Sequence, residues 1–166
     1  MQAAKEFLSL INQHQNIIHK VCNIYMHDSA DKEDLFQEII VQLWKAVPKF
    51  QEQSRFSTWL YRVALNTAIS DFRKKRRALP VIQTEVASLE IESELIDDKD
   101  ERLKTLYAAI TQLQEIDKAI VMLYLEDKSY DEMEDIVGIS ASTLRVRMNR
   151  IKEKLRELTK NTSHGS

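Results

Sequence analysis

The sequence predicts an all-α protein with two small helical domains joined by an acidic linker, the second a helix-turn-helix domain. Only 2 Gly and 2 Pro occur in 166 residues, and a β-rich fold needs many more turn-forming residues. Apolar side chains recur every three or four residues over long stretches, which is typical of amphipathic helices. The hydrophobic content of 43% is sufficient for packed cores. We predict domains over residues 1–78 and 103–160, a linker over 79–102 and a disordered tail over 161–166.

The first domain is predicted to contain three helices. The first runs from about Ala3 to Met26, Ser29 or Asp31 can cap the second, and Pro48 ends or bends that second helix. The third follows the polar residues 51–54 and runs into a cluster of bases. Each helix carries one apolar stripe: Phe7, Ile11, Ile18, Val21 and Tyr25 in the first, Leu35, Phe36, Ile39, Ile40, Leu43, Trp44 and Val47 in the second, and Phe56, Trp59, Leu60, Val63 and Thr67 in the third.

The second domain is predicted to contain four helices. Two are outlined by the apolar residues Leu106, Ile110 and Leu113 and by Ala119, Ile120, Leu123 and Tyr124. A short helix from Ser129 to Val137 then ends at Gly138, and Ser140 can cap a long last helix. That helix places Leu144, Met148, Ile151, Leu155 and Leu158 on one face and Ser142, Arg145, Val146, Asn149 and Arg150 on the opposite face. A short helix, a glycine turn and an arginine-rich helix are typical of a helix-turn-helix.

The net charge of −2 conceals strong segregation along the chain. Residues 51–78 carry seven bases against two acids (+5), residues 79–117 carry three bases against ten acids (−7), and residues 138–160 carry seven bases against two acids (+5). Two basic segments separated by an acidic one favour a chain that touches a polyanion at two places. Ordinary solvated helix faces are the alternative, which two nearly unmixed basic segments disfavour.

Several classes of function find no support in the sequence. There is no glycine-rich phosphate loop and no nucleophile motif, so we expect neither an enzyme nor a cofactor. His14, His19, Cys22 and His27 lie close together, but their spacings do not match a tetrahedral site, so no metal is expected and Cys22 is interpreted as a buried thiol. No apolar stretch reaches the ~20 residues of a membrane span and no signal peptide is recognisable. We therefore expect a cytoplasmic protein without direct membrane insertion.

Two stretches, Asp34 to Arg77 and Leu113 to Glu157, resemble a known family. In this order, with an acidic linker between them, they resemble regions two and four of extracytoplasmic-function (ECF) RNA polymerase sigma factors. The run TWLYRVA over residues 58–64, followed by Asn66, is the most specific part of the match. The resemblance implies a transcription initiation factor that binds RNA polymerase core and promoter DNA. It also implies an anti-sigma factor as a further partner.

The resemblance assigns core binding to the helix that matches Asp34 to Ala46. In the family this helix docks on the clamp helices of the largest polymerase subunit. Here its polar face can meet a basic partner through complementary charge and hydrogen bonds. The implied core-binding residues are Asp34, Gln37, Glu38 and Gln42.

The resemblance assigns recognition and melting of the −10 promoter element to the stretch from Phe50 to Asn66. Because opening a duplex costs unstacking energy, the protein must capture a freed base, and aromatic rings and an asparagine amide suit that purpose. The implied pocket residues are Phe50, Ser54, Phe56 and Asn66, whereas Trp59 is interpreted as core. The bases Arg62, Arg73, Lys74, Lys75, Arg76 and Arg77 are implied to hold phosphates.

The resemblance assigns recognition of the −35 element to the last helix, in the major groove. The implied base-contacting residues are Arg145, Val146, Asn149 and Arg150, with Thr143 and Arg147 on backbone phosphates. The chain departs from the usual pattern at two positions: Val146 stands where a small polar residue is common, and Asn149 stands where an aromatic is possible. The preceding helix is unusually acidic, with Asp131, Glu132, Glu134 and Asp135.

Two other functions would fit parts of the sequence. A stand-alone helix-turn-helix transcriptional regulator with a helical N-terminal domain would explain the last helices, but neither the TWLYRVA run nor the bases near residue 75. A protein that binds polymerase or an inhibitor without reading DNA is disfavoured by the presence of Asn66, Arg145 and Arg150.

Overall fold

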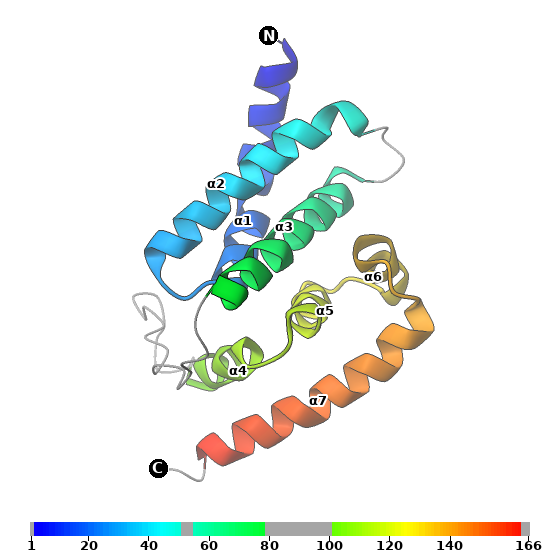
Figure 1. Cartoon of the computed structure of the whole chain (residues 1–166). Helices are drawn as coiled ribbons and strands as arrows, with labels where there is room; N and C mark the ends of the chain where they lie inside the picture. Colours follow the sequence, from blue (N-terminus) through cyan, green and yellow to red (C-terminus); the bar gives the residue numbers. More distant parts are fainter. Residues whose placement is uncertain (1, 51–54, 79–100, 164–166) are drawn as a thin grey trace. The chain divides into compact units, whose positions relative to one another are not determined.

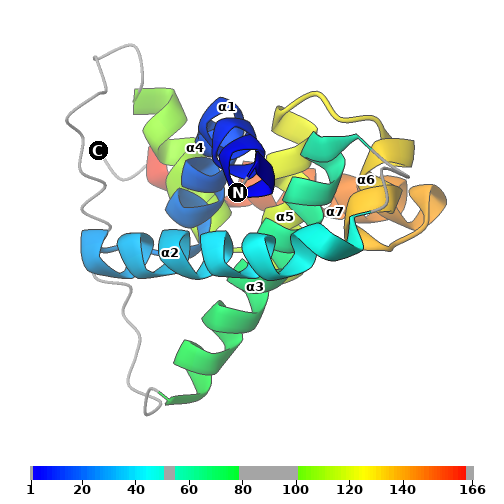
Figure 2. The ribbon, with the colours of Figure 1, turned by 90° about the horizontal axis from the view of Figure 1, so that it is seen from above.

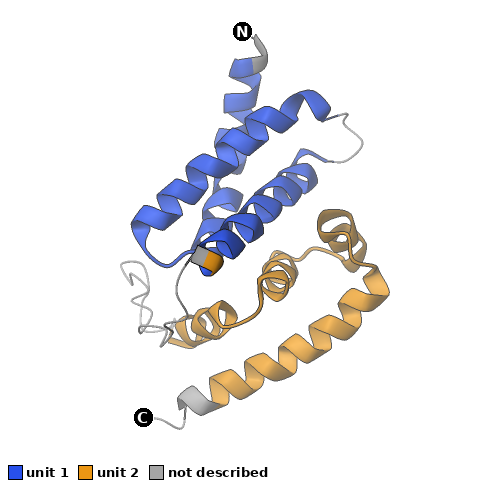
Figure 3. Cartoon of the chain, viewed as in Figure 1, with its two compact units in different colours: residues 1–76 blue, residues 77–166 orange. Residues whose placement is uncertain are grey.

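A computed structural model of the chain describes residues 2–50, 55–78 and 101–163, and the account below concerns these residues. They form seven α-helices and one 3-10 turn, and no strand occurs among them, so the all-α prediction is confirmed. The chain divides into two compact units, residues 1–76 and residues 77–166 (Figure 3). Of the helices that the structure describes, none is both long and apolar enough to cross a membrane.

The first unit consists of α1 (Gln2–Tyr25), α2 (Ser29–Ala46), the 3-10 turn η1 (Val47–Lys49) and α3 (Phe56–Ala78). Asp28 caps α2, because its Oδ1 accepts a 2.7 Å hydrogen bond from the backbone N–H of Asp31. The prediction that Ser29 or Asp31 caps this helix is therefore wrong. The bond to the Asp31 amide also holds the pKa of Asp28 below its usual value. Pro48 lies inside η1, as expected of a residue that cannot continue the α-helical hydrogen bonds.

The core of the first unit lies between its three helices. Helix α1 crosses α2, and Figure 2 shows α1 nearly end-on while α2 runs lengthwise. Contacts between rings of α1 and α3 join these two helices as well, at Tyr25 with Phe72 and at His14 with Phe56. The buried apolar side chains are Phe7, Ile11, Ile18, Val21, Cys22, Ile24, Tyr25, Met26, Leu35, Ile39, Leu43, Trp59, Leu60, Tyr61, Ala64, Leu65, Ala68 and Ile69.

Trp44 departs from the predicted stripe of α2. Its side chain is 50% exposed, whereas Leu35, Ile39 and Leu43 are fully buried. The buried residues follow a strict spacing of four, and Trp44 lies one residue beyond Leu43, about 100° further around the helix. The indole makes an edge-on contact with Phe7, at 5.1 Å between ring centroids.

The second unit consists of α4 (Glu101–Thr111), α5 (Glu115–Leu125), α6 (Tyr130–Val137) and α7 (Ala141–Ser163). Figure 1 shows α4, α5 and α6 arranged along the long helix α7, and each of them contacts it. The buried stripe of α7 consists of Leu144, Met148, Ile151 and Leu155, as its spacing predicted.

Two predicted boundaries differ from the structure. Glu101 and Arg102, which we assigned to the linker, lie in the first turn of α4, where an acid interacts favourably with the helix N-terminus. Residues 161–163, which we assigned to a disordered tail, continue α7, since no Gly or Pro interrupts the helix there. Residues 79–100 of the predicted linker and residues 164–166 of the predicted tail lie outside the described residues.

The turn between α6 and α7 sets the direction of α7. Gly138 has φ 76°, a left-handed conformation, and its N–H donates to the carbonyl of Glu134. Ser140 then caps α7 as predicted, because its Oγ accepts from the Thr143 N–H at 3.3 Å. Ser129 caps α6 in the same way, through a 3.1 Å bond from the Glu132 N–H.

The end of α5 has the geometry of a Schellman motif without a glycine. Asp127 has φ 59°, its N–H donates to the Tyr124 carbonyl, and the Lys128 N–H donates to the Leu123 carbonyl. A non-glycine residue in this conformation carries strain of about 1–2 kcal/mol. Aspartate tolerates it better than most residues, but a carboxylate at a helix C-terminus also opposes the helix dipole.

These two left-handed positions predict opposite effects on stability. Asp127→Gly relieves strain and is expected to raise the free energy of unfolding of the second unit by about 0.5–1 kcal/mol. Gly138→Ala introduces the same strain and is expected to lower it by about 1–2 kcal/mol, although its Cβ would meet open space. Urea unfolding followed by circular dichroism measures both. A lower midpoint for Asp127→Gly would show that the Asp127 side chain makes a stabilising contact that outweighs the backbone strain.

Candidate functional site

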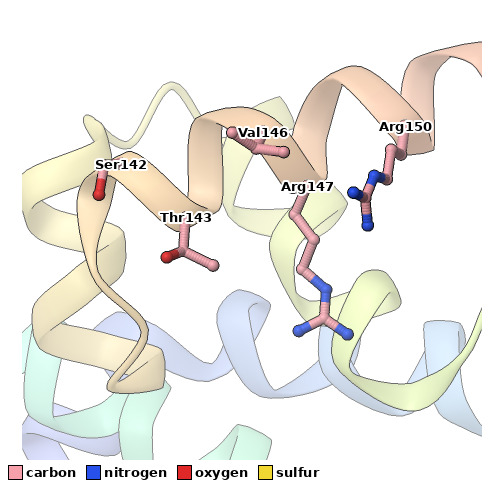
Figure 4. A pocket seen from close by; sticks show the side chains of 5 residues that line it. All are labelled: Ser142, Thr143, Val146, Arg147 and Arg150. Atoms are coloured by element: carbon pink, nitrogen blue, oxygen red, sulfur yellow. The ribbon is translucent and has the colours of Figure 1, made fainter.

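The outer face of α7 presents the residues predicted to contact bases. Arg145, Asn149 and Arg150 are exposed, and the side chain of Val146 is 54% exposed. Figure 4 shows that Ser142, Thr143, Val146, Arg147 and Arg150 line one shallow, open depression along this helix. The opposite stripe, from Leu144 to Leu155, is buried. The fold therefore brings the predicted −35 residues together on the solvent-facing side of α7.

Three side chains on this surface are held by neighbours. The Arg145 guanidinium carbon lies 5.1 Å from the ring centroid of Tyr130, in α6, which is a cation–π contact. The Thr143 Oγ1 accepts a 2.8 Å hydrogen bond from Ser140 Oγ at the cap of α7. The Nε of Arg147 lies 3.3 Å from Oδ1 of Asp117, in the first turn of α5.

The acidic residues of α6 are solvent-exposed. Asp131, Glu132, Glu134 and Asp135 all face outward, and Asp131 and Glu132 lie in the first turn, where acids favour the helix N-terminus. Lys128 pairs with Glu132 at 3.9 Å. The outer surface of α6 is therefore negative, whereas the outer surface of α7 is positive.

The second basic surface follows α3. Asn66 and Arg62 are exposed one helical turn apart, and Arg73, Lys74, Arg76 and Arg77 are exposed in the last two turns. Lys75 differs from these bases because its Nζ lies 3.1 Å from Asp31 and 3.8 Å from Asp71. Partial desolvation lowers the pKa of Lys75, but the hydrogen bond to Asp31 and the charges of the nearby carboxylates outweigh it, so the pKa is raised. Lys75 thus joins the end of α3 to the start of α2.

Aromatic rings gather where η1 approaches the start of α3. The ring centroid of Phe50 lies 4.9 Å from Trp59 and 6.0 Å from Phe56, and Phe56 lies 5.4 Å from Trp59. Phe50 and Phe56 are half-buried, whereas Trp59 is buried, as its interpretation as core predicted. The two phenylalanines predicted to trap a base are therefore adjacent, and both contact the buried ring of Trp59. Ser54, the fourth predicted pocket residue, lies outside the described residues.

The predicted core-binding residues lie on the outer face of α2. Asp34, Gln37 and Glu38 are exposed, Gln42 is half-buried, and the Gln42 amide donates to Glu38 at 2.9 Å. Val41 and Trp44, which are 43% and 50% exposed, lie on the same helix. The face thus combines acids and amides with two large apolar side chains, a composition that suits a protein partner.

The two histidines of α1 contact aromatic rings, and the cysteine of α1 is a buried free thiol. The His14 ring contacts Phe56 and its Nδ1 lies 2.9 Å from the Leu10 carbonyl, while His19 stacks on Phe36 at 4.6 Å. Burial raises the pKa of the Cys22 thiol to about 12, so at neutral pH it is neither a thiolate ligand nor a nucleophile. Within the described part of the chain, no three His, Cys, Asp or Glu side chains are grouped as metal ligands would be.

Sequence reasoning missed three residues at these surfaces. The exposure of Trp44 contradicts its apolar spacing, and no local signal distinguishes it from the buried stripe. Tyr130 under Arg145 and Asp117 beside Arg147 are contacts between helices, which periodicity does not reveal. From the sequence, Asp117 is counted only among the acids of residues 79–117, whereas the structure places it in the first turn of α5.

Comparison with known proteins matches both units. The family model for sigma-70 region 2 matches residues 10–78, and that for sigma-70 region 4 matches residues 103–155. The chain is 27% identical to the ECF RNA polymerase sigma factor SigW of Bacillus subtilis, over 91% of this chain and 87% of that protein. It is 29% identical to the RNA polymerase sigma-H factor of Pseudomonas aeruginosa, over 81% of this chain and 78% of that protein.

A solved structure shares the fold. The sigma factor RpoE of Bartonella quintana, crystallised with the anti-sigma factor NepR, superposes with a TM-score of 0.68 at 20% identity, covering 94% of this chain and 98% of that chain. Both the order of the two matched regions and the fold agree with the resemblance seen in the sequence.

The ion pairs of Lys75 predict a difference between two neighbouring lysines. Lys75→Gln removes the link between α3 and α2 and is expected to lower the free energy of unfolding by about 0.5–1 kcal/mol, since the partly exposed pair is screened by solvent. Lys74→Gln makes the same change in charge at an exposed position and is expected to have little effect. Urea unfolding of the two variants tests this. Equal losses would show that Lys75 stabilises the unit only through the net charge of the cluster.

Proposed function

From the premise that the chain belongs to the sigma-70 family, as an ECF RNA polymerase sigma factor with regions 2 and 4, we propose how its surfaces divide the work of transcription initiation. The outer face of α7 recognises the −35 element, α3 with the adjacent aromatic cluster recognises and melts the −10 element, and the outer face of α2 binds RNA polymerase core. The observation that carries this proposal is the separation of each set of residues from the buried stripe of its own helix.

The −35 assignment is supported by the exposure and chemistry of α7. Arg145 and Arg150 are exposed guanidinium groups about one turn and about two and a half turns into α7. Arginine binds guanine through two parallel hydrogen bonds. Asn149 can pair with adenine, and Val146 can contact a thymine methyl group. Thr143, in the first turn of α7, and Arg147, which lies between the base-contacting residues in sequence, suit the flanking phosphates.

The −10 assignment is supported by the aromatic cluster and the exposed Asn66. Phe50 and Phe56 are only half-buried, so each retains ring surface on which a flipped base can stack. Trp59 behind them keeps the two rings in place. The exposed bases Arg62, Arg73, Lys74, Arg76 and Arg77 lie along α3 and suit the phosphates of the same strand. Lys75 is the exception, because its ammonium is held by Asp31.

Core binding is supported by the mixed composition of the α2 face. The carboxylates of Asp34 and Glu38 complement a basic partner surface, and exposed Trp44 and Val41 provide apolar area that would become buried. Tryptophan, with tyrosine and arginine, is enriched among the few residues that dominate the energy of a protein interface. We add Trp44 and Val41 to the residues of this interface.

Control by an anti-sigma factor is supported by the relatives. RpoE of Bartonella quintana binds NepR, and CnrH binds the cytosolic domain of CnrY. Both chains share the fold of this protein, with TM-scores of 0.68 and 0.67. An anti-sigma factor would act here by covering one of the surfaces described above.

The core-binding face predicts the effect of reversing its charges. Asp34→Lys with Glu38→Lys is expected to weaken binding to polymerase core at least about tenfold, because two carboxylates that attract a basic partner become repulsive. Glu153→Lys with Glu157→Lys is a matched control, with the same spacing and the same change in charge on exposed positions of α7. Co-purification with core measures the effect, and circular dichroism checks the fold. If both double variants bind core equally well, the docking surface lies elsewhere.

The reading face of α7 predicts sequence-dependent losses. Arg150→Ala is expected to weaken promoter binding by the holoenzyme by about 1–3 kcal/mol, the value of a bidentate contact with guanine. This loss should shrink on promoters already altered in the −35 element. Arg156→Ala, an exposed arginine six residues further along the same helix, is the control and should have a smaller effect on all sequences. If Arg150→Ala weakens every sequence equally, α7 grips the backbone instead of reading bases.

A further inference from the structure

The ion pair between Asp117 and Arg147 joins the start of α5 to the DNA-facing helix α7. Oδ1 of Asp117 lies 3.3 Å from Nε of Arg147. The Asp117 side chain is 18% exposed and that of Arg147 is 36% exposed, so solvent screens the pair only in part. Figure 4 shows the Arg147 side chain reaching away from α7, beside the depression that it lines with Thr143 and Arg150.

The carboxylate depends on this arginine. Oδ1 of Asp117 is shielded from solvent and accepts no hydrogen bond from any residue that the structure describes, although the Arg147 Nε lies 3.3 Å away. A shielded carboxylate oxygen without a hydrogen bond is unfavourable unless a cation lies beside it. Arg147 is that cation, so the Nε side of its guanidinium is held toward α5.

The geometry points to Asp117 as a positioning residue for promoter binding, which fixes the guanidinium of Arg147 so that its terminal Nη groups meet one DNA phosphate. This inference rests on the proposed −35 role of α7. A guanidinium is planar and donates through two separate edges, so one edge can bind a carboxylate while the other binds a phosphate. Apart from Asp117 and among the described residues, the structure gives Arg147 no ion-pair or hydrogen-bond partner.

A positioning role and a purely electrostatic role of Asp117 predict opposite effects on promoter affinity when its carboxylate is removed. Removing a carboxylate makes the protein more positive, which by itself strengthens binding to DNA. If Asp117 positions Arg147, Asp117→Asn is instead expected to weaken promoter binding by the holoenzyme about fivefold to tenfold. The slope of log affinity against log salt concentration should become shallower by about 0.9, the value of one lost phosphate contact.

The experiment uses holoenzyme and a duplex promoter mapped from the transcripts that overexpression induces, at several salt concentrations. Glu134→Gln is the control, since it removes one negative charge from an exposed position of the same unit, and its affinity should be unchanged or slightly higher. Arg147→Ala should reproduce the loss of Asp117→Asn, and in the Asp117→Asn background it should change the affinity by less than about twofold. Asp117→Glu, which restores a carboxylate, should recover part of the binding.

Three outcomes would overturn the inference. Tighter binding and a steeper slope for Asp117→Asn would mean that Asp117 competes with phosphate for Arg147. A lower melting temperature with an unchanged slope would mean that Asp117 only stabilises the start of α5. Wild-type binding by Arg147→Lys would mean that charge suffices, because one ammonium cannot hold carboxylate and phosphate on separate edges. This last variant also decides the matter if Asp117→Asn fails to fold.

Failure of the proposed −35 role of α7 can be distinguished from failure of the inference about Asp117. If Arg145→Ala and Arg150→Ala leave −35-dependent binding intact, α7 is not the reading helix, and both proposals fall. If those variants lose binding while Asp117→Asn and Arg147→Ala do not, only the inference about Asp117 is wrong.

Discussion

Burial of the apolar stripe of α7 is the constraint on which the DNA-facing surface depends. Leu144, Met148, Ile151 and Leu155 are packed against the three shorter helices of the second unit, and each buried side chain of this size contributes about 1.5–3 kcal/mol. Since α-helical geometry fixes the remaining directions, burying this stripe leaves Arg145, Asn149 and Arg150 facing solvent. The left-handed Gly138 and the Ser140 cap determine where the helix begins. The packing of the apolar stripe of α7 therefore determines which of its side chains can contact DNA.

In the first unit the surface residues rely on links between helices. Asp28 fixes the start of α2, and Lys75 ties the same helix end to the last turns of α3. Trp59 fills the space behind Phe50 and Phe56. The segments that carry the proposed core-binding and −10 surfaces are thus held by the same small core. A substitution in this core should disturb both surfaces together.

The spacing of apolar residues was sufficient to predict the helices and most buried positions, because in an amphipathic helix this spacing identifies the buried face. Gly138 and Ser140 were predictable for the same reason, since each has a specific local role. Three features were not predictable. Asp127 adopts a glycine conformation without being glycine, Lys75 pairs with a residue 44 positions away, and Asp117 pairs with Arg147 from another helix. The first depends on backbone tolerance and the others on tertiary contacts, neither of which a local pattern contains. The family resemblance supplied the roles of the exposed residues, which periodicity alone would have read as ordinary solvated faces.

The burial of Cys22 has a practical consequence for spectroscopy. It is the one cysteine in the chain, it is 2% exposed, and its pKa of about 12 leaves almost no thiolate at neutral pH. Maleimide and related reagents attack the thiolate, so the native chain should behave toward them as if it had no cysteine. Cysteines introduced at one exposed position in each unit can then carry a donor and an acceptor fluorophore without background labelling. Energy transfer between such dyes would report the separation of the two units in the free chain and in the holoenzyme.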